Sequence, residues 1–455
     1  MSALRVTSVL GIASALLITP HAQAASETEL AQIRDEIRAL KEQYEARIRA
    51  LEERLQAAQT APAPSPAAPA PSATASGGRG VAAFNPAISL VLQGTFARFG
   101  QDPQRYTIRG FQKTEEVSPG RRGLGLGESE LNLFANVDDK FAGSMTVALT
   151  PENTVSVEEA YGYVPSLSNG LVPKFGRFFS GIGYLNEQHQ HTWDFVDAPL
   201  VYQALLGGQF THDGVQLKWV APTDQFVELG AEIGNGNGFP GSARNSNGAG
   251  AWSVFAHTGG DIGASHSWRA GVSFLDTRAR DRAATQLDTM GNLADVAFSG
   301  RSYVVAADVV WKWAPNGNPR ERNFKLQGEY VWRRERGNLT YDPSGALGAT
   351  NTDAYSSSQS GWYLQGAYQF MPQWRAGLRY DRLSPGSPVY GSNADLLAIA
   401  GFHPDRATVM LDYTPSEFSR FRLQYANSRT RPDVTDHQLY LQYILTLGAH
   451  GPHRF

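Results

Sequence analysis

The sequence predicts an all-β protein, a transmembrane antiparallel β-barrel of 16 strands preceded by a short periplasmic coiled-coil helix. The 455-residue chain is rich in glycine (46) and in Phe (22), Tyr (18) and Trp (9), yet its mean hydropathy is −0.33. No stretch approaches the 18 consecutive apolar residues of a membrane helix. Instead, segments of about ten residues alternate apolar and polar side chains, which is typical of barrels with a lipid-facing exterior and a wet lumen.

The composition excludes several classes of protein. With no Cys in the chain, disulfide frameworks, thiolate metal sites, cysteine nucleophiles and a lipoprotein anchor are all excluded. The 40 basic and 43 acidic residues give a net charge of −3, which does not favour a nucleic-acid partner. We expect no cofactor.

Residues 1–24 read as a secretory signal peptide. Arg5 supplies a positive charge, 6–18 is mostly apolar, and Ala22-Gln23-Ala24 is a cleavage site of small residues. The alternative is a frayed N-terminal helix. A cleaved signal implies that the chain is exported.

Residues 25–56 read as a coiled-coil helix, and 57–83 as an Ala/Pro/Ser-rich linker. Apolar residues recur at spacings of 3, 4, 3, 4, 4, 3 and 4, flanked by Glu, Arg and Lys. A short helix with so narrow a stripe is stabilised by pairing, so we expect it to assemble a homotrimer. The alternative is a single amphipathic helix docked on its own domain. The stripe comprises Leu30, Ile33, Ile37, Leu40, Tyr44, Ile48, Leu51 and Leu55.

Residues 84–455 hold the predicted barrel. In the last strand, Leu439, Leu441 and Tyr443 alternate with Gln438 and Gln442. Sixteen such segments begin near residues 88, 128, 140, 155, 171, 212, 225, 250, 267, 300, 322, 359, 374, 404, 418 and 437. The alternative is a soluble propeller, but it explains neither the signal peptide nor the unequal connections.

Short turns and long loops alternate between these segments, as in an outer-membrane barrel. Short turns are expected at 138–140, 221–224, 371–373 and 414–417. Long loops are expected at about 100–127, 179–211, 277–299, 335–358 and 383–403.

Alternation of side chains predicts a lumen with walls of opposite charge. An acidic wall is expected from Glu130, Asp138, Glu158, Glu228 and Glu232. A basic wall is expected from Arg269, Lys312, Lys325, Arg333, Arg375, Arg379, Arg406, Arg420 and Arg422, diluted by Asp308, Glu329, Asp381 and Asp412. Such walls orient dipolar solutes and favour anions, unless the charges only solvate the lumen and pair with one another. Alternation places Glu159 on the outer face, so either that strand lies in a subunit interface or its register differs.

The loop at about 179–211 is apolar and aromatic enough to pack, so we expect it to fold into the barrel as a constriction. Its polar edge would be Glu187, His189, His191, Asp194 and Asp197. Imidazoles near carboxylates are common zinc ligands, which makes His189, His191 and His212 weak metal candidates. The alternative is that they are hydrogen-bonded loop residues, and His450 and His453 similarly read as a periplasmic tail.

Several stretches resemble the phosphate-selective porins of Gram-negative outer membranes. They are Glu159-Ala160-Tyr161, Lys174-Phe175-Gly176-Arg177-Phe178, Trp193-Asp194-Phe195-Val196-Asp197 and Asp213-Gly214-Val215-Gln216-Leu217. The N-terminal helix is similar to that of trimeric porins with a periplasmic coiled coil. The resemblance implies 16 strands, homotrimers and passive uptake of small, often anionic solutes. That family's Arg and Lys ladder has no residue-by-residue match here, and the acidic loop argues against phosphate as the solute.

Together these features predict a passive diffusion porin in the outer membrane, embedded in lipid and lipopolysaccharide, that passes small hydrophilic, anionic or zwitterionic solutes. One alternative is a zinc-related uptake channel. Another is a tether whose helix binds peptidoglycan or other periplasmic partners. An enzyme is not expected, because no Gly-x-Ser-x-Gly or comparable catalytic constellation occurs.

Overall fold

The computed structural model describes residues 87–448, apart from 116, 152, 166, 349 and 398–400. The expected signal peptide (1–24), coiled coil (25–56), linker (57–83) and C-terminal tail lie outside the described residues. No helix among the described residues is both long and apolar enough to cross a bilayer.

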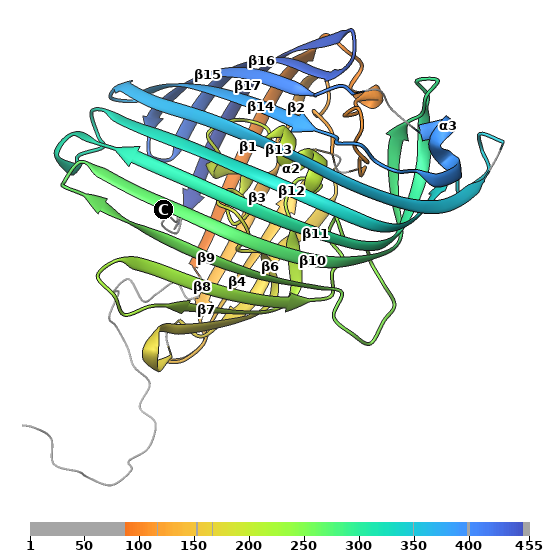
Figure 1. The fold of residues 1–455 in the computed structure, drawn as a ribbon. Coiled ribbons are helices and arrows are strands. Elements are labelled where there is room, and N and C mark those ends of the chain that lie inside the picture. The colour runs from red at the N-terminus through yellow and green to blue at the C-terminus, as the bar shows by residue number, and fades with distance from the viewer. Residues whose placement is uncertain are drawn as a thin grey trace, which may run out of the picture. The chain divides into compact units, whose positions relative to one another are not determined.

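The regular secondary structure of the described chain is almost entirely antiparallel β-strand (Figure 1). The strands are β1 (Ala87–Phe99), β2 (Gly123–Leu126), β3 (Ser129–Asn136), β4 (Ala142–Leu149), β5 (Val155–Tyr163), β6 (Leu171–Phe179), β7 (Thr211–Val220), β8 (Phe226–Gly234), β9 (Ala251–Ile262), β10 (His266–Leu287), β11 (Leu293–Trp313), β12 (Asn323–Tyr341), β13 (Asn351–Met371), β14 (Trp374–Ser384), β15 (Asp405–Ser416), β16 (Ser419–Arg431) and β17 (Val434–Gly448). Two short helices, α2 (Leu200–Leu205) and α3 (Ala394–Leu397), lie in loops, as do the single 3₁₀ turns Pro103–Arg105, Ser168–Gly170, Gln190–Thr192, Pro315–Gly317 and Gly391–Asn393.

The sheet closes on itself through β1. One edge of β1 pairs with β17, and its other edge pairs with β2 over 94–97 and with β3 over 87–91. Because β2 and β3 lie along the same edge of one strand, they form a single interrupted strand. The barrel therefore has the 16 strands predicted from the alternation.

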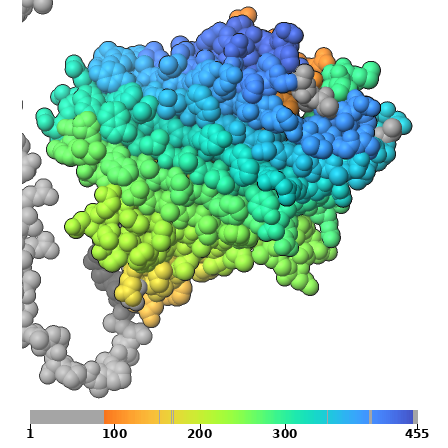
Figure 2. All heavy atoms as spheres, in the orientation of Figure 1, coloured from red at the N-terminus to blue at the C-terminus, as the bar shows by residue number. Residues whose placement is uncertain are grey.

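The outward face of the barrel is apolar. Alternate residues of neighbouring strands expose aliphatic side chains, such as Val309 (48%), Leu378 (59%), Val409 (48%) and Leu441 (48%). The space-filling view shows the strands from green to blue forming an unbroken wall (Figure 2). A belt of exposed aliphatic residues this extensive is suited to lipid and not to water. The fold is that of an outer-membrane barrel of the porin type.

The predicted connections are confirmed in part. Short turns follow β3, β7, β13 and β15, and long loops at 100–122, 180–210 and 385–404 occupy the opposite end. The expected long loops 277–299 and 335–358 are wrong, because β10 to β13 continue through most of both ranges. The outward face of these extensions carries polar residues such as Arg278, Arg336 and Asn338, which do not meet the criterion of an apolar outer face. Their inward face joins Phe298, Leu339 and Tyr355 in a second buried cluster, and cross-strand backbone pairing requires no apolar exterior.

Two of the long loops contribute to a hydrophobic core enclosed by the barrel. Tyr106, Ile108 and Phe111 from loop 100–122 join apolar residues of loop 180–210 and of β10 to β14 in one buried cluster. The interior is therefore not lined by polar side chains throughout. This core fixes the position of the loop at 180–210.

Candidate channel constriction

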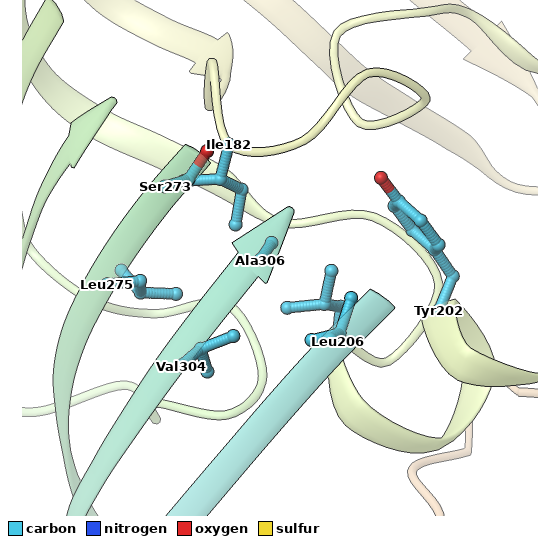
Figure 3. Close-up of a pocket in the computed structure, with 8 residues that line it drawn as sticks. Ile182, Tyr202, Leu206, Ser273, Leu275, Val304 and Ala306 are labelled. Carbon is cyan, nitrogen blue, oxygen red and sulfur yellow. The ribbon is translucent and has the colours of Figure 1, made fainter. Parts of the chain in front are cut away.

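The loop at 180–210, here called the constriction loop, packs against residues of the barrel strands in one buried cluster. Pro199 precedes α2, and all six residues of that helix are buried. Figure 3 shows Ile182, Tyr202 and Leu206 of the loop facing Leu275 and other residues of the barrel wall across a small apolar pocket. Burial of this apolar stretch against β10 to β12 holds one side of the loop to the wall.

The start of the loop is held by Glu329 on β12. The Glu329 carboxylate accepts hydrogen bonds from the backbone N–H groups of Tyr184 (3.1 Å) and Leu185 (3.0 Å), and from the hydroxyl groups of Tyr202 (2.8 Å) and Tyr363 (2.6 Å). Gly183 has a φ of 68°, and a Cβ there would collide with that carboxylate. A glycine is needed for the close approach.

The middle of the loop is tied to the basic wall by Asp194. One carboxylate oxygen of Asp194 accepts from Lys325 Nζ (3.0 Å) and Gln365 (3.0 Å), and the other accepts from Arg375 (2.6 Å). Burial alone raises the pKa of Asp194, but the charges of Lys325 and Arg375 outweigh it and hold the pKa well below its usual value. Asp194 therefore stays ionised.

Asp197 makes a second tie to the same wall. Its carboxylate accepts from Arg379 (2.9 Å) and Gln424 (2.8 Å) and pairs with Arg406. Burial raises the pKa of Asp197, and Arg406 and Arg379 lower it further than burial raises it. Three strands, β14 to β16, thus converge on one loop carboxylate.

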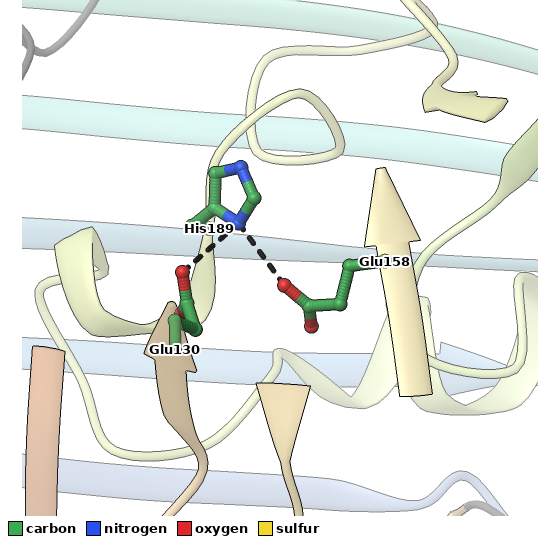
Figure 4. A group of neighbouring side chains, drawn as sticks. All are labelled: Glu130, Glu158 and His189. Carbon is green, nitrogen blue, oxygen red and sulfur yellow. Dashed lines mark hydrogen bonds and ion pairs between the residues drawn. The ribbon is translucent and has the colours of Figure 1, made fainter. Parts of the chain in front are cut away.

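The two loop histidines bind a different wall. His189 Nδ1 lies 3.1 Å from Glu158 and 3.3 Å from Glu130, while its Nε2 lies 3.0 Å from Glu159. His191 Nδ1 lies 2.7 Å from the other oxygen of Glu130. Burial alone lowers the pKa of His189, but the surrounding carboxylates raise it well above its usual value. Figure 4 shows His189 between Glu130 and Glu158.

A β-bulge explains how both Glu158 and Glu159 reach this histidine. The register between β4 and β5 shifts so that Thr146 faces Glu159 and Val147 faces Val157, which leaves Glu158 as the extra residue. The bulge breaks the strict alternation, so Glu159 is buried with an exposure of 9%. Of the two alternatives left open for Glu159, the register of this strand differs, since alternation cannot foresee an inserted residue.

The constriction loop therefore bonds to two groups of strands that carry opposite charge. Within nine residues it presents imidazoles to the acidic residues of β3 and β5, and carboxylates to the basic residues of β12, β14 and β15. Many of the charges assigned to the two walls are paired through the loop.

Four of the remaining members of the basic wall, Arg269, Arg333, Arg420 and Arg422, contact the loop or an acid. Arg333 donates to the carbonyl groups of Ala204 (3.3 Å) and Leu205 (3.1 Å). Arg420 (3.4 Å) and Arg422 (3.0 Å) donate to the carbonyl of Trp193. Arg269 lies 3.8 Å from Asp308, and Lys312 is half-buried on β11. Asp412 pairs with Arg375 and Arg422, and Asp381 with Arg379 and Arg406.

The rest of the acidic wall is paired too. Glu232 accepts from the backbone N–H of Gly181 (2.8 Å) and lies 3.4 Å from His212, so this histidine is apart from the His189 cluster. Glu187 accepts from Lys218 (2.6 Å), and Glu228 lies 3.0 Å from His257. Lys218, a buried residue of β7 between Leu217 and Trp219, was not among the predicted residues, although the alternation of β7 places it on the inward face.

Asp138 was wrongly assigned to the lumen. It is exposed in the turn after β3, where its carboxylate accepts from the backbone N–H groups of Lys140 (2.8 Å) and Phe141 (2.7 Å). A short side chain that satisfies its own turn is a common role for Asp.

Comparison with known proteins adds a relative and several structural neighbours. No protein-family profile matches the chain. An uncharacterized protein of Aquifex aeolicus is 31% identical over 411 residues, covering 82% of this chain and 80% of the relative. The chain belongs to the family of this Aquifex protein. Because the relative is described only as uncharacterized, membership in its family assigns no activity.

Among solved structures, the outer-membrane channel DcaP of Acinetobacter baumannii has a TM-score of 0.47 and 14% identity, covering 79% of this chain and 96% of DcaP. An anion-selective porin from Comamonas acidovorans has a TM-score of 0.46 and 10% identity, covering 79% and 98%. OprB of Pseudomonas putida has a TM-score of 0.44 and 14% identity, covering 80% and 94%. Similarity at this level concerns the fold alone. The resemblance of this chain to the phosphate-selective porins stays a prediction.

Proposed function

We propose that this protein is an outer-membrane porin, a water-filled channel for passive diffusion of small hydrophilic solutes, narrowed by the constriction loop. The observation that carries the proposal is a loop tied from inside to two charged walls of a closed barrel with an apolar exterior. A loop that only stabilised the barrel would need no charged side chains in contact with water. The side chains of Lys325 and Arg375, however, remain 19% and 23% exposed.

The charge near Asp194 favours anions over cations. Lys325, Arg375, Arg420 and Arg422 contribute four positive charges, and Asp194 and Asp412 contribute two negative charges, so this group carries a net charge of +2. Clustered arginines also bind carboxylates and phosphates through paired hydrogen bonds. We propose a mild preference for anionic or zwitterionic solutes, with the pore-lining roles predicted from the sequence.

The oligomer and the N-terminal parts are proposed from the sequence alone. We propose export by the 1–24 signal and a homotrimer held in part by the 25–56 helix in the periplasm. Chemical crosslinking of the folded protein, with and without 25–56, tests this assembly.

Planar-bilayer recording tests the channel itself. We expect stepwise openings in groups of three from a trimer, and a reversal potential in a salt gradient that shows anion preference at neutral pH. A barrel that inserts and stays silent contradicts the channel and favours the tether. A cation-selective reversal potential contradicts the proposed selectivity and leaves the channel standing.

A further inference from the structure

We propose that Glu130, Glu158 and His189 form a binding site for a divalent metal ion that joins the constriction loop to the barrel wall. The inference goes beyond the proposed function, since metal binding can be measured without any conductance. The ligand atoms of these three residues all lie within 4.8 Å of one another. They come from three separate elements, β3, β5 and the loop (Figure 4).

The distances around His189 are those of a ligand set. Its Nδ1 lies 3.1 Å from a Glu158 oxygen and 3.3 Å from a Glu130 oxygen. Ligands bound to one ion at about 2.1 Å are separated from each other by roughly 3.0–3.4 Å in tetrahedral or octahedral geometry. A single N–H cannot donate well to two carboxylates, whereas one ion between the three atoms satisfies all of them.

Two of the three proposed ligands also have the supporting partner that a metal site requires. The second nitrogen of His189 lies 3.0 Å from Glu159, and a carboxylate in this position orients a metal-bound imidazole. The second oxygen of Glu130 lies 2.7 Å from His191. The bulge at Glu158 makes the arrangement possible, because it brings two successive carboxylates to one face.

An independent observation concerns the oxygen of Glu130 that faces the site. Glu130 has no exposed surface, and within the described part of the chain its Oε2 makes no hydrogen bond beyond its 3.3 Å contact with His189 Nδ1, a nitrogen that Glu158 shares. Three carboxylates also converge on one imidazole, and buried like charges repel one another. His191 at Glu130 and Lys174 near Glu159 offset part of this repulsion, whereas Glu128 beside Glu158 adds another acidic group. A divalent ion would bind Oε2, and with two positive charges it neutralises more of the carboxylate charge than an imidazolium does.

The donor set selects the class of ion. One imidazole and two carboxylates suit Zn²⁺, Mn²⁺, Fe²⁺ or Co²⁺ and disfavour soft ions such as Cu⁺. Three protein ligands leave at least one position for water. His212, an earlier candidate, takes no part, because it is bonded to the Glu232 cluster.

The test is direct metal binding to the full chain, purified in detergent without a histidine tag. We expect equilibrium dialysis with Zn²⁺ and with Mn²⁺ to give one ion per chain. Glu158→Gln should weaken binding at least tenfold, and Glu159→Gln by about 10- to 100-fold. The matched control is Glu228→Gln, the same substitution beside His257 elsewhere in the interior, and it should bind like the wild type.

Two further measurements keep the result decisive. Heat-modifiable migration on gels reports whether each variant is folded. If Glu158→Gln does not fold, the Co²⁺-loaded wild type is used, and its visible spectrum must show nitrogen and oxygen ligation at one saturable site. No stoichiometric binding by the wild type, or unchanged binding in folded Glu158→Gln, overturns the site. A silent barrel that still binds one ion contradicts the channel and not the site.

Discussion

Replacing Asp194 by Asn separates the charge of the constriction from its shape. The amide is nearly the same size as the carboxylate, but it cannot neutralise Lys325 and Arg375. Hydrogen bonds to charged groups contribute about 1.5–3 kcal/mol each. Asn retains part of the bonding, so we expect the free energy of unfolding to fall by about 3 kcal/mol. Urea titration followed by tryptophan fluorescence measures this change.

The same substitution should alter ion selectivity. The local net charge rises from +2 to +3 when the Asp194 carboxylate is lost. A unit charge about 8 Å from a permeating ion contributes about 0.5 kcal/mol in a water-like medium, and screening at 0.1 M salt roughly halves it. Because anions and cations are shifted in opposite directions, the anion-to-cation permeability ratio should rise about twofold, as measured by reversal potential.

The control for Asp194→Asn is Asp433→Asn, the same change in the exposed turn between β16 and β17. It should leave both the free energy of unfolding and the selectivity unchanged. An unchanged reversal potential in folded Asp194→Asn would show that this group of charges does not border the ion path.

Three other perturbations test the same architecture. Leu205→Ala removes a fully buried side chain of α2 and should lower the free energy of unfolding by about 2–5 kcal/mol. The loosened loop should also increase the current noise, and stable openings like those of the wild type would contradict a packed loop. Val309→Arg places a charge on the lipid face and should cost about 2–4 kcal/mol in urea-dependent folding into vesicles if it lies near the bilayer midplane, whereas unaffected folding would mean that this face does not meet lipid. Because the pKa values of Asp194 and Asp197 are lowered, their stabilisation is present above the usual carboxylate range and is lost only as the pH falls through their low folded-state values. Single-channel conductance should therefore stay constant from pH 7 to pH 4. A change in conductance near pH 4 to 5 would show that other carboxylates determine it.

Much of the barrel could be predicted because lipid imposes a simple rule on strands. The outward residues of β17 had to be apolar at every second position, so Leu441 and Tyr443 identified both the strand and its facing. The rule loses its force outside the bilayer, and there the prediction ended β10 and β12 too early. The inward face carried less information still, because a lumen accepts polar, charged and apolar residues.

The constriction could be located from the sequence, but its bonding could not. An apolar loop flanked by amphipathic strands predicted insertion into the barrel. Which wall His189 and Asp197 would meet depended on the closure of 16 strands, since their partners lie far from them along the chain. The site around His189 depended on a one-residue bulge at Glu158, and no local pattern announces such an insertion.

The long-range ion pairs of the constriction loop have a consequence for how the protein folds. Asp197 meets Arg406 about 200 residues later in the chain, while His191 meets Glu130 about 60 residues earlier. Bonds of such long range form late, because loop closure is costly before the strands that carry both partners are paired. Until then the carboxylates and guanidinium groups remain hydrated, so the constriction cannot mature ahead of the barrel. Seating of the loop thus depends on strands that lie both before and after it in the chain.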